Sequence, residues 1–126
     1  MLAGIGVDIV EISRFQHLLS RFGERISRRL LTDKELEQFN KRGQSLSFIA
    51  SRFAAKEAAS KALGTGIAKG INFHSIEVVN DSSGKPELVF HGVAKEMLQQ
   101  RNITHSLLSL SDEKNYVVAM AVLESS

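Results

Sequence analysis

The chain has 126 residues, the usual length of one domain, and is 43% hydrophobic and 24% charged, as ordinary soluble globular proteins are. Its formal net charge is only +2, and the absence of cysteine excludes a disulfide framework and thiolate chemistry and disfavours a structural zinc site. No apolar run reaches the roughly 18–20 residues that span a bilayer and no signal peptide is recognisable, so we expect a cytoplasmic protein without a membrane partner.

A strand is expected over residues 5–12. This segment is rich in isoleucine and valine and is interrupted only by Gly6, Asp8 and Glu11, which predicts a strand buried on both faces. Asp8 is therefore unusual, and Gly6, two residues earlier on the same face, leaves space beside it. An alternative explanation for Asp8 alone is a carboxylate that accepts backbone hydrogen bonds at the end of the strand.

Three short helices are expected to follow. Ser13 and Gln16 have the spacing of a capping box, which predicts a helix over residues 13–22. A second short helix continues through residue 30. Thr32 and Glu35 repeat the capping-box spacing at the start of a third helix, which runs to about residue 40.

Positive charge is concentrated in the first two of these helices. Five arginines stand there against the single acidic residue Glu24, namely Arg14, Arg21, Arg25, Arg28 and Arg29. Such a local patch predicts an anionic partner: a nucleic acid, a phosphorylated ligand or an acidic protein. The alternative is a solvated helix face that has no partner.

A long helix is expected over residues 45–63. The apolar stripe of this helix continues into two polar residues within an arc of roughly 100°, in the order Leu46, Ile49, Ala50, Phe53, Glu57 and Ser60. The pattern predicts that Glu57 faces the core, where a charge requires a partner, a metal ion or a raised pKa. The alternative for Glu57 is a surface pair with Lys61, four residues later.

The second half of the chain is expected to consist mostly of strands. Short strands over residues 76–79 and 88–90 are joined by a turn-rich loop that contains Gly84, Lys85 and Pro86, and its simplest interpretation is a rigid turn. A helix over residues 93–101 and a hairpin over residues 103–123 follow. With helices early and strands late, we expect a single α+β domain over residues 1–126, with helices packed on one antiparallel-rich sheet.

Asp8 and Glu57 together are more informative than either residue alone. Two carboxylates on otherwise apolar elements, without cysteine or paired histidines, suit Mg²⁺, which takes its remaining ligands from water and a substrate phosphate. Lys61 lies one turn after Glu57, and Lys56 and Arg52 border the same region of the helix. Cations beside a metal-binding carboxylate fit phosphate binding and the stabilisation of a transferring phosphoryl group.

Two segments, GIGVDIVEI (residues 4–12) and RFAAKEAASKALGTG (residues 52–66), resemble the holo-[acyl-carrier-protein] synthase family of bacterial 4′-phosphopantetheinyl transferases. The likeness extends over nearly the whole chain, through GKP (residues 84–86) and YVVA (residues 116–119). It implies transfer of the phosphopantetheine arm of coenzyme A to a serine of acyl carrier protein, which leaves adenosine 3′,5′-bisphosphate and supports fatty acid biosynthesis. It also implies a homotrimer with active sites in the clefts between protomers.

Carried over residue by residue, the resemblance assigns the Mg²⁺ ligands to Asp8 and Glu57, and the contact with the coenzyme A phosphates to Lys61. The acceptor serine belongs to the carrier protein. The family assigns deprotonation of this serine to the glutamate or to a metal-held water, and we favour Glu57, acting directly or through water. Further coenzyme-contacting positions match Arg52, Ser60, Gly64, Thr65, Gly84, Lys85 and Pro86. The surface that receives the acidic carrier protein matches Arg14, Arg21 and Arg25, in agreement with the charge pattern.

One position departs from the family pattern. The family commonly has a histidine near the ligand, nine residues before Tyr116, but this position is Leu107, with His105 two residues earlier on the same face. His105 is therefore left out of the predicted site. Two other hypotheses are a nucleic-acid-binding module built on the arginines, which the shortage of stacking aromatics disfavours, and a Mg²⁺-dependent pyrophosphate hydrolase.

Overall fold

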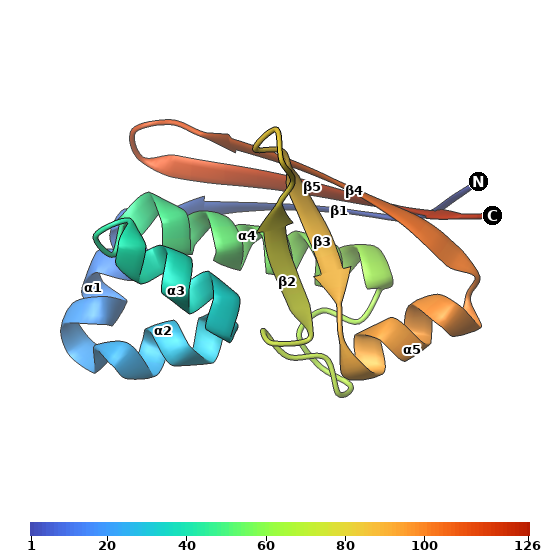
Figure 1. Ribbon diagram of the computed structural model, residues 1–126, viewed down its shortest axis with the longest axis horizontal. Helices are drawn as coiled ribbons and strands as arrows, with labels where there is room; N and C mark the ends of the chain where they lie inside the picture. Colours follow the sequence, from blue (N-terminus) through green and yellow to red (C-terminus); the bar gives the residue numbers. More distant parts are fainter.

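One long helix, α4 (Leu46–Leu63), runs along one face of a three-stranded antiparallel sheet, and the other elements are grouped around it (Figure 1). The computed structural model describes all of residues 1–126. The elements follow in the order β1 (Leu2–Glu11), α1 (Ser13–Phe22), α2 (Glu24–Leu30), α3 (Asp33–Lys41), α4, β2 (Ile76–Asn80), β3 (Pro86–Phe90), α5 (Gly92–Gln100), β4 (Ile103–Asp112) and β5 (Tyr116–Ser125). None of the helices combines the length and the apolar character needed to cross a membrane.

The predicted α+β class is confirmed, but the strands form two sheets and not one. Strands β1, β5 and β4 make an antiparallel sheet in that order, whereas β2 pairs only with β3. Helices α1, α2 and α3 gather near one end of α4 and α5 lies near the other, while the β2–β3 hairpin crosses α4 between them (Figure 1). Helix α4 thus contacts the large sheet, the short helices and β2.

The large sheet is covered on one face only. Along β1, Gly6 and Val10 are buried beneath α4, whereas Ile5, Val7 and Ile9 are 64%, 54% and 64% exposed. The prediction that this strand is buried on both faces is wrong for the single chain, because no element covers the second face. We call this second face the outer apolar face; it is formed by Ile5, Val7, Ile9, Leu107, Val118 and Met120.

Helix α4 is buried on almost every side. Its buried positions include six alanines, namely Ala50, Ala54, Ala55, Ala58, Ala59 and Ala62. A single apolar stripe is therefore a poor guide to this helix, because several elements pack around it. Glu57, predicted to face the core, is only half-buried, as are Leu46 and Phe53. The charged side chain of α4 that has no exposure at all is the neighbouring Lys56.

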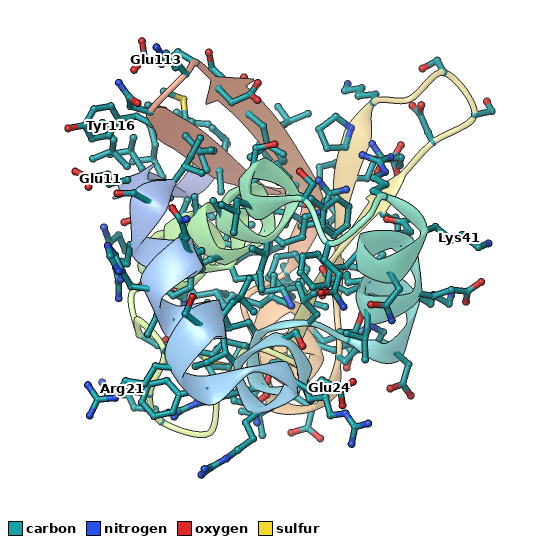
Figure 2. All side chains as sticks on the ribbon, turned by 90° about the vertical axis from the view of Figure 1, so that its left-hand side faces the viewer. Glu11, Arg21, Glu24, Lys41, Glu113 and Tyr116 are labelled. Carbon is teal, nitrogen blue, oxygen red and sulfur yellow. The ribbon has the colours of Figure 1, made fainter.

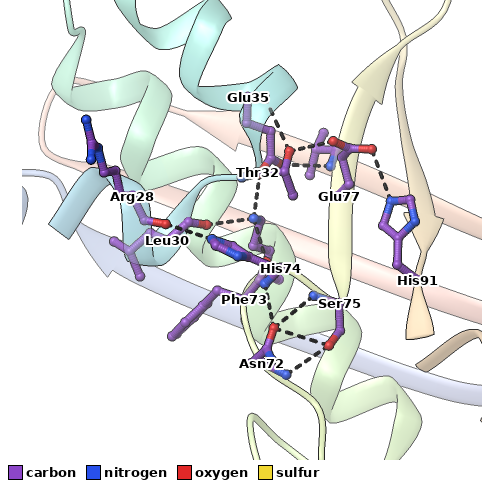
Figure 3. A network of polar contacts seen from close by, with 12 residues as sticks. Arg28, Leu30, Thr32, Glu35, Asn72, Phe73, His74, Ser75, Glu77 and His91 are labelled. Carbon is purple, nitrogen blue, oxygen red and sulfur yellow. Dashed lines mark hydrogen bonds and ion pairs between the residues drawn. The ribbon is translucent and has the colours of Figure 1, made fainter. Parts of the chain in front are cut away.

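Lys56 is held by three acceptors in the core. Its Nζ donates to the Glu35 carboxylate at 2.5 Å, to the Leu30 carbonyl oxygen at 2.6 Å and to the Phe73 carbonyl oxygen at 2.7 Å. Figure 3 shows the three residues that supply these acceptors, Glu35, Leu30 and Phe73. These contacts use all three N–H donors of an ammonium group. Burial lowers the pKa of Lys56, and the charge of Glu35 opposes this shift. The prediction that Lys56 borders the phosphate site is wrong, because its ammonium group is fully engaged in the core.

The two predicted capping boxes have different outcomes. Thr32 and Glu35 form one at the start of α3: the Thr32 hydroxyl accepts from the Glu35 N–H, and the Glu35 carboxylate accepts from the Thr32 N–H. The capping box of Ser13 is wrong, because Ser13 already belongs to the first turn of α1, and a capping residue precedes that turn. The N-cap is Ile12, and the Ser13 hydroxyl donates to the Glu11 carboxylate instead.

Strand β1 and helix α4 approach so closely that only glycine fits at two positions. A Cβ atom at Gly6 would overlap the carbonyl oxygen of Ala58, and one at Gly4 would overlap the carbonyl oxygen of Ala62. The space that the sequence suggested beside Asp8 is thus filled by the backbone of α4. Because Asp8 is two residues farther along the same strand face, this contact sets how near Asp8 comes to the side chains of the helix.

Gly6→Ala is expected to destabilise the fold by about 3 kcal/mol, because the added methyl group meets backbone atoms that cannot turn aside as a flexible side chain can. Urea unfolding at neutral pH measures the change. Gly43→Ala is the control: Gly43 has a φ of 67° and open space around it, so only the left-handed backbone conformation costs energy, about 1 kcal/mol. Equal stability of Gly6→Ala and the wild type would contradict the close contact.

Candidate functional site

Asp8 of β1 and Lys61 of α4 form an ion pair where these two elements meet. Lys61 Nζ lies 3.0 Å from Asp8 Oδ1 and 3.1 Å from the carbonyl oxygen of Val7. An ammonium group has three N–H donors, so one donor of Lys61 is left for another acceptor. The Lys61 side chain is 50% exposed and that of Asp8 only 15%, so the lysine remains accessible from solvent.

Glu57 stands one helical turn before Lys61 and belongs to the same region. Burial raises the pKa of Glu57, the negative charge of Asp8 raises it further, and the charges of Lys61 and Arg14 oppose the rise. Glu57 takes part in no ion pair of the chain, whereas Asp8 does. Two carboxylates that repel each other, one of them without an ion-pair partner, suit a hard divalent cation.

The donor set fits Mg²⁺ better than a zinc-type site. No group of three or more histidine, aspartate or glutamate side chains is placed to hold a metal ion. Mg²⁺ needs few protein ligands, because it keeps several waters and takes oxygens from a substrate phosphate. Asp8 and Glu57 are therefore the residues that fit as its ligands, and the other coordination positions would be left to water and substrate.

Helix α1 contributes a cation to the same region. The Arg14 guanidinium lies 5.1 Å from the centre of the Phe53 ring, and its charge acts against the rise in the pKa of Glu57. Phe53 is itself fixed by an edge contact with Phe15 at 5.3 Å and a stacked contact with Phe73 at 5.5 Å. The sequence pattern predicts that Arg14 belongs to a partner-binding surface. The structure also brings Arg14 close to Glu57.

Arg21 and Arg25 lie farther along the same surface, exposed on α1 and α2, and Figure 2 shows Arg21 pointing away from the molecule. Arg25 borders a pocket of about 190 Å³ that Phe22 and Ile26 also line. The Arg21 guanidinium lies 5.3 Å from the centre of the Phe22 ring. The surface thus combines positive charge with an apolar pocket.

A second cluster surrounds Arg52, in the first half of α4. Arg52 is only 5% exposed, lies over the Phe48 ring at 4.1 Å, and donates to Ser51 Oγ at 3.1 Å and to Asn80 Oδ1 at 2.9 Å. It pairs with no carboxylate, its Nε has no hydrogen-bond partner, and burial lowers its pKa to about 10. A pocket of about 210 Å³ beside it, which we call the arginine pocket, is also lined by Arg42 and by one carboxylate residue, Asp112. A buried guanidinium without a counter-ion indicates a site for an anionic ligand.

The predicted coenzyme-contacting turn lies beside Arg52 and not beside Glu57. Asn80, the last residue of β2, accepts a hydrogen bond from Arg52 and donates one to the Gly84 carbonyl oxygen at 2.9 Å. The structure therefore connects one of the predicted turn residues, Gly84, to Arg52 through Asn80, and Pro86 pairs with Asn80 in the β2–β3 ladder; the turn does not itself line the arginine pocket.

The predicted residues fall into two groups on different sides of α4. Arg52 precedes Glu57 by five residues, which at about 100° per residue separates them by about 140° around the helix. Lys61 and Gly64 share the side of Glu57, and Gly64 caps the helix in the left-handed conformation with a φ of 83°. Within one chain, no side-chain contact joins the carboxylates to the arginine pocket.

Ser60 and Thr65 lie near the carboxylates, but their hydroxyl groups are engaged inside the chain. The Ser60 side chain is buried, and its hydroxyl donates to the Glu57 carbonyl oxygen at 2.8 Å. The Thr65 hydroxyl donates to the Gly66 carbonyl oxygen at 2.7 Å. Either hydroxyl would have to rotate before it could donate a hydrogen bond to a ligand.

Sequence reasoning missed Arg42 and Phe48, which line the arginine pocket, and Asn80, which binds Arg52. The sequence contains one weak signal of this site: Arg42 is a basic residue shortly before the start of a long helix, a position that favours anion binding. Nothing in the sequence marks Asn80, because its contact with Arg52 depends on the fold that brings β2 beside α4.

A family model described as the 4′-phosphopantetheinyl transferase superfamily matches residues 4–121, and a holo-[acyl-carrier-protein] synthase of Vibrio cholerae is 51% identical over 124 residues, 98% of each chain. The chain belongs to the holo-[acyl-carrier-protein] synthase family. The crystal structure of the family member from Neisseria meningitidis is 40% identical, with a TM-score of 0.93 over 99% of this chain and 100% of its own. That of the Helicobacter pylori synthase, solved in complex with coenzyme A, is 32% identical, with a TM-score of 0.84 over 95% of this chain and 99% of its own.

Membership of the holo-[acyl-carrier-protein] synthase family confirms the resemblance drawn from residues 4–12 and 52–66. The protein is therefore an enzyme, a phosphopantetheinyl transferase. The two segments that carry the resemblance form most of β1 and the second half of α4, the elements that bring Asp8 and Glu57 together. The part of the sequence most typical of the family is thus the part that forms the carboxylate pair.

Glu57→Gln is expected to raise the thermal midpoint of the metal-free protein at pH 7, because it removes a charge that burial disfavours and that Asp8 repels. The pKa of Glu57 in the folded protein lies above its ordinary value of 4.5. Above the raised pKa, ionisation of Glu57 therefore lowers the stability of the folded protein. Near pH 4, Glu57 is largely protonated in the folded and the unfolded protein, so the gain in thermal midpoint should vanish there.

Thermal unfolding at both pH values, in the presence of a chelator, measures this gain. Glu37→Gln is the matched control, because Glu37 is exposed and pairs with Lys41 at 3.1 Å, so its removal relieves no repulsion. A thermal midpoint of Glu57→Gln at or below that of the wild type at pH 7 would contradict the unfavourable ionisation of Glu57 in the folded protein.

Proposed function

We propose that this enzyme transfers the 4′-phosphopantetheine group of coenzyme A to a serine of apo acyl carrier protein in a Mg²⁺-dependent reaction. The products would be holo acyl carrier protein and adenosine 3′,5′-bisphosphate, and the reaction would support fatty acid biosynthesis in the cytoplasm. The observation that carries the proposal is the Asp8–Glu57 carboxylate pair with Lys61 beside it, in a member of this family. The coenzyme A complex of the Helicobacter pylori relative supports the choice of donor.

Asp8 and Glu57 would hold the metal ion. When bound, Mg²⁺ supplies positive charge that neutralises the diphosphate of coenzyme A and the charge developing on the leaving phosphate. The two carboxylates are carried by a strand and a helix in direct contact, so their mutual position is set before any ligand arrives. Lys61 binds Asp8 and so keeps that carboxylate oriented.

The transfer exchanges one phosphorus–oxygen bond for another. The serine oxygen of the carrier attacks the phosphorus that bears the pantetheine arm, and the bond from this phosphorus to the oxygen of the adenosine phosphate breaks. Glu57 accepts the serine proton directly or through a water. Lys61 uses its open N–H donor to stabilise negative charge on the transferring group.

The arginine pocket would bind the nucleotide end of the coenzyme. Arg52 lacks a counter-ion and shares the pocket with Arg42, so a phosphate group there would be held by two cations. The turn residues Gly84, Lys85 and Pro86 would contact the same end of the coenzyme. Three residues on the other side of α4 would contact the coenzyme near its diphosphate: Ser60, Gly64 and Thr65.

We further propose a homotrimer in which each active site lies between two protomers. One protomer would supply Asp8, Glu57 and Lys61, and its neighbour would supply the arginine pocket and the turn, which one chain alone does not bring together. The outer apolar face supports the assembly, because a contiguous patch of exposed isoleucine, valine, leucine and methionine marks a protein contact.

Arg14, Arg21 and Arg25 would receive the acidic carrier protein. Positive charge on this surface would steer the carrier toward the enzyme, and the pocket bordered by Phe22 and Ile26 offers an apolar contact. Arg14 is the member of this surface whose charge acts on Glu57, so a carrier bound there would present its serine close to the proposed base. The single domain of residues 1–126 would contain every residue that one protomer contributes.

Incubation of the protein with apo acyl carrier protein, coenzyme A and Mg²⁺ is expected to add one phosphopantetheine group to the carrier, detected by its mass. Asp8→Asn and Glu57→Gln are each expected to slow transfer at least about 100-fold, because a charge-stabilising or proton-accepting group is lost, with far smaller changes in stability. Glu37→Gln, an exposed carboxylate on α3, is the control and should keep the wild-type rate.

Removal of Mg²⁺ by a chelator should stop the reaction, and added Mg²⁺ should restore it. No mass increase with the wild type, or undiminished transfer by both variants, would contradict the proposal. Release of free phosphopantetheine from coenzyme A with the carrier unmodified would instead indicate the pyrophosphate hydrolase.

Ile9→Lys is expected to convert the trimer into monomers, because it places a charge on the outer apolar face, and light scattering measures the mass. Val93→Lys is the matched control, since Val93 is also apolar and 42% exposed but lies on α5. The monomeric Ile9→Lys protein should lose transfer activity although its own carboxylates are intact. A wild-type protein that is already monomeric would rule out the assembly.

A further inference from the structure

Asn80 connects Arg52, which lines the arginine pocket, to a turn that is far from it in the chain. Its side-chain amide uses both of its functions: Oδ1 accepts a hydrogen bond from Arg52 Nη2 at 2.9 Å, and Nδ2 donates one to the Gly84 carbonyl oxygen at 2.9 Å. One side chain therefore fixes the distance between a buried cation of α4 and the tip of the β2–β3 turn (residues 81–85).

The guanidinium of Arg52 has few other polar restraints. Its only other hydrogen bond goes to the neighbouring Ser51 at 3.1 Å, its flat side rests on the Phe48 ring at 4.1 Å, and its Nε has no partner. An arginine recognises a phosphate through paired hydrogen bonds from a planar fork, which depend on orientation. The hydrogen bond with Asn80 is the one that connects the Arg52 guanidinium to an element other than α4.

The β2–β3 turn has its own internal order. The Asp81 carboxylate accepts hydrogen bonds from the Ser83 N–H at 2.8 Å, the Ser83 hydroxyl at 2.7 Å and the Lys85 N–H at 2.9 Å. The Gly84 N–H donates to the Asp81 carbonyl oxygen at 2.9 Å. These bonds make the turn rigid without attaching it to α4, and the side chain of Asn80 makes that attachment.

We propose that Asn80 is a positioning residue for the coenzyme: it holds the Arg52 guanidinium and the Gly84 turn in one geometry, so that both engage the phosphorylated nucleotide end together. This inference rests on the proposed function, in which the pocket and the turn bind coenzyme A. Asn80 acts through Arg52 and through the turn and touches no reacting atom. Its contribution is to the binding of the coenzyme and not to the transfer step.

Asn80→Ala is expected to raise the KM for coenzyme A about tenfold, while kcat and the KM for the carrier protein stay within about twofold, since the lost hydrogen bonds orient only the coenzyme site. Titration of the wild type and the variant with coenzyme A alone should show the same tenfold loss of affinity. Gln99→Ala, which removes a side-chain amide from the exposed face of α5, is the matched control and should change neither quantity.

Two further variants separate positioning from a general loss of structure. Asn80→Asp keeps the acceptor for Arg52, loses the donor to Gly84 and adds a negative charge that competes with phosphate for the guanidinium, so its KM should rise beyond that of Asn80→Ala. In an Arg52→Lys background, Asn80→Ala should have a smaller effect than in the wild type, because the oriented fork is already gone. A purely structural role would lower the thermal midpoint and combine additively with Arg52→Lys.

The outcomes distinguish this inference from the proposed function. If the wild type transfers phosphopantetheine and Asn80→Ala leaves the KM and the affinity for coenzyme A unchanged, the inference is overturned and the function stands. A fall in kcat larger than the rise in KM would also overturn it. If the wild type neither binds coenzyme A nor modifies the carrier, the proposed function fails and the inference fails with it.

Discussion

The direct contact between the backbones of β1 and α4 is the constraint on which the site depends. Gly4 and Gly6 leave no side chain between the strand and the helix, so the Ala58 and Ala62 backbones occupy the space where a Cβ atom would lie. Asp8, two residues beyond Gly6, therefore comes within hydrogen-bonding distance of a lysine of the helix and close enough to Glu57 to raise its pKa. The glycines are needed to position a carboxylate as much as to pack a core.

Three charged residues of α4 show how buried charge can serve structure or ligand binding. All three N–H donors of Lys56 bind Glu35 and two carbonyl oxygens, so its charge is stabilised entirely by groups of the same chain. Glu57 has a like charge nearby and no ion pair, and Arg52 has an unpaired Nε and no carboxylate. Because leaving a charge partly buried and unmatched is unfavourable, the last two residues indicate places where a ligand completes the interaction.

Features with a local cause were predictable from sequence. The Thr32–Glu35 capping box, the end of α4 at Gly64 and the order of helices and strands all depend on residues close together in the chain. The carboxylate pair was predictable as well, because Asp8 and Glu57 each stand out in an apolar segment. The prediction failed for the outer face of β1, for the box at Ser13 and for Lys56, where the outcome depends on what packs against the element.

The amino-acid sequence by itself determined the α+β class, the elements, the two carboxylates with their lysine and the membership of the family. Only the tertiary structure decided how the charged residues are partnered: Arg14 lies beside Glu57, Lys56 lies inside the core, and Arg52 is joined to the β2–β3 turn through Asn80. It also decided that one face of the large sheet is uncovered. The physical reason is that periodicity describes the faces of a single element, whereas burial, ion pairing and pKa depend on neighbours that are distant in the chain.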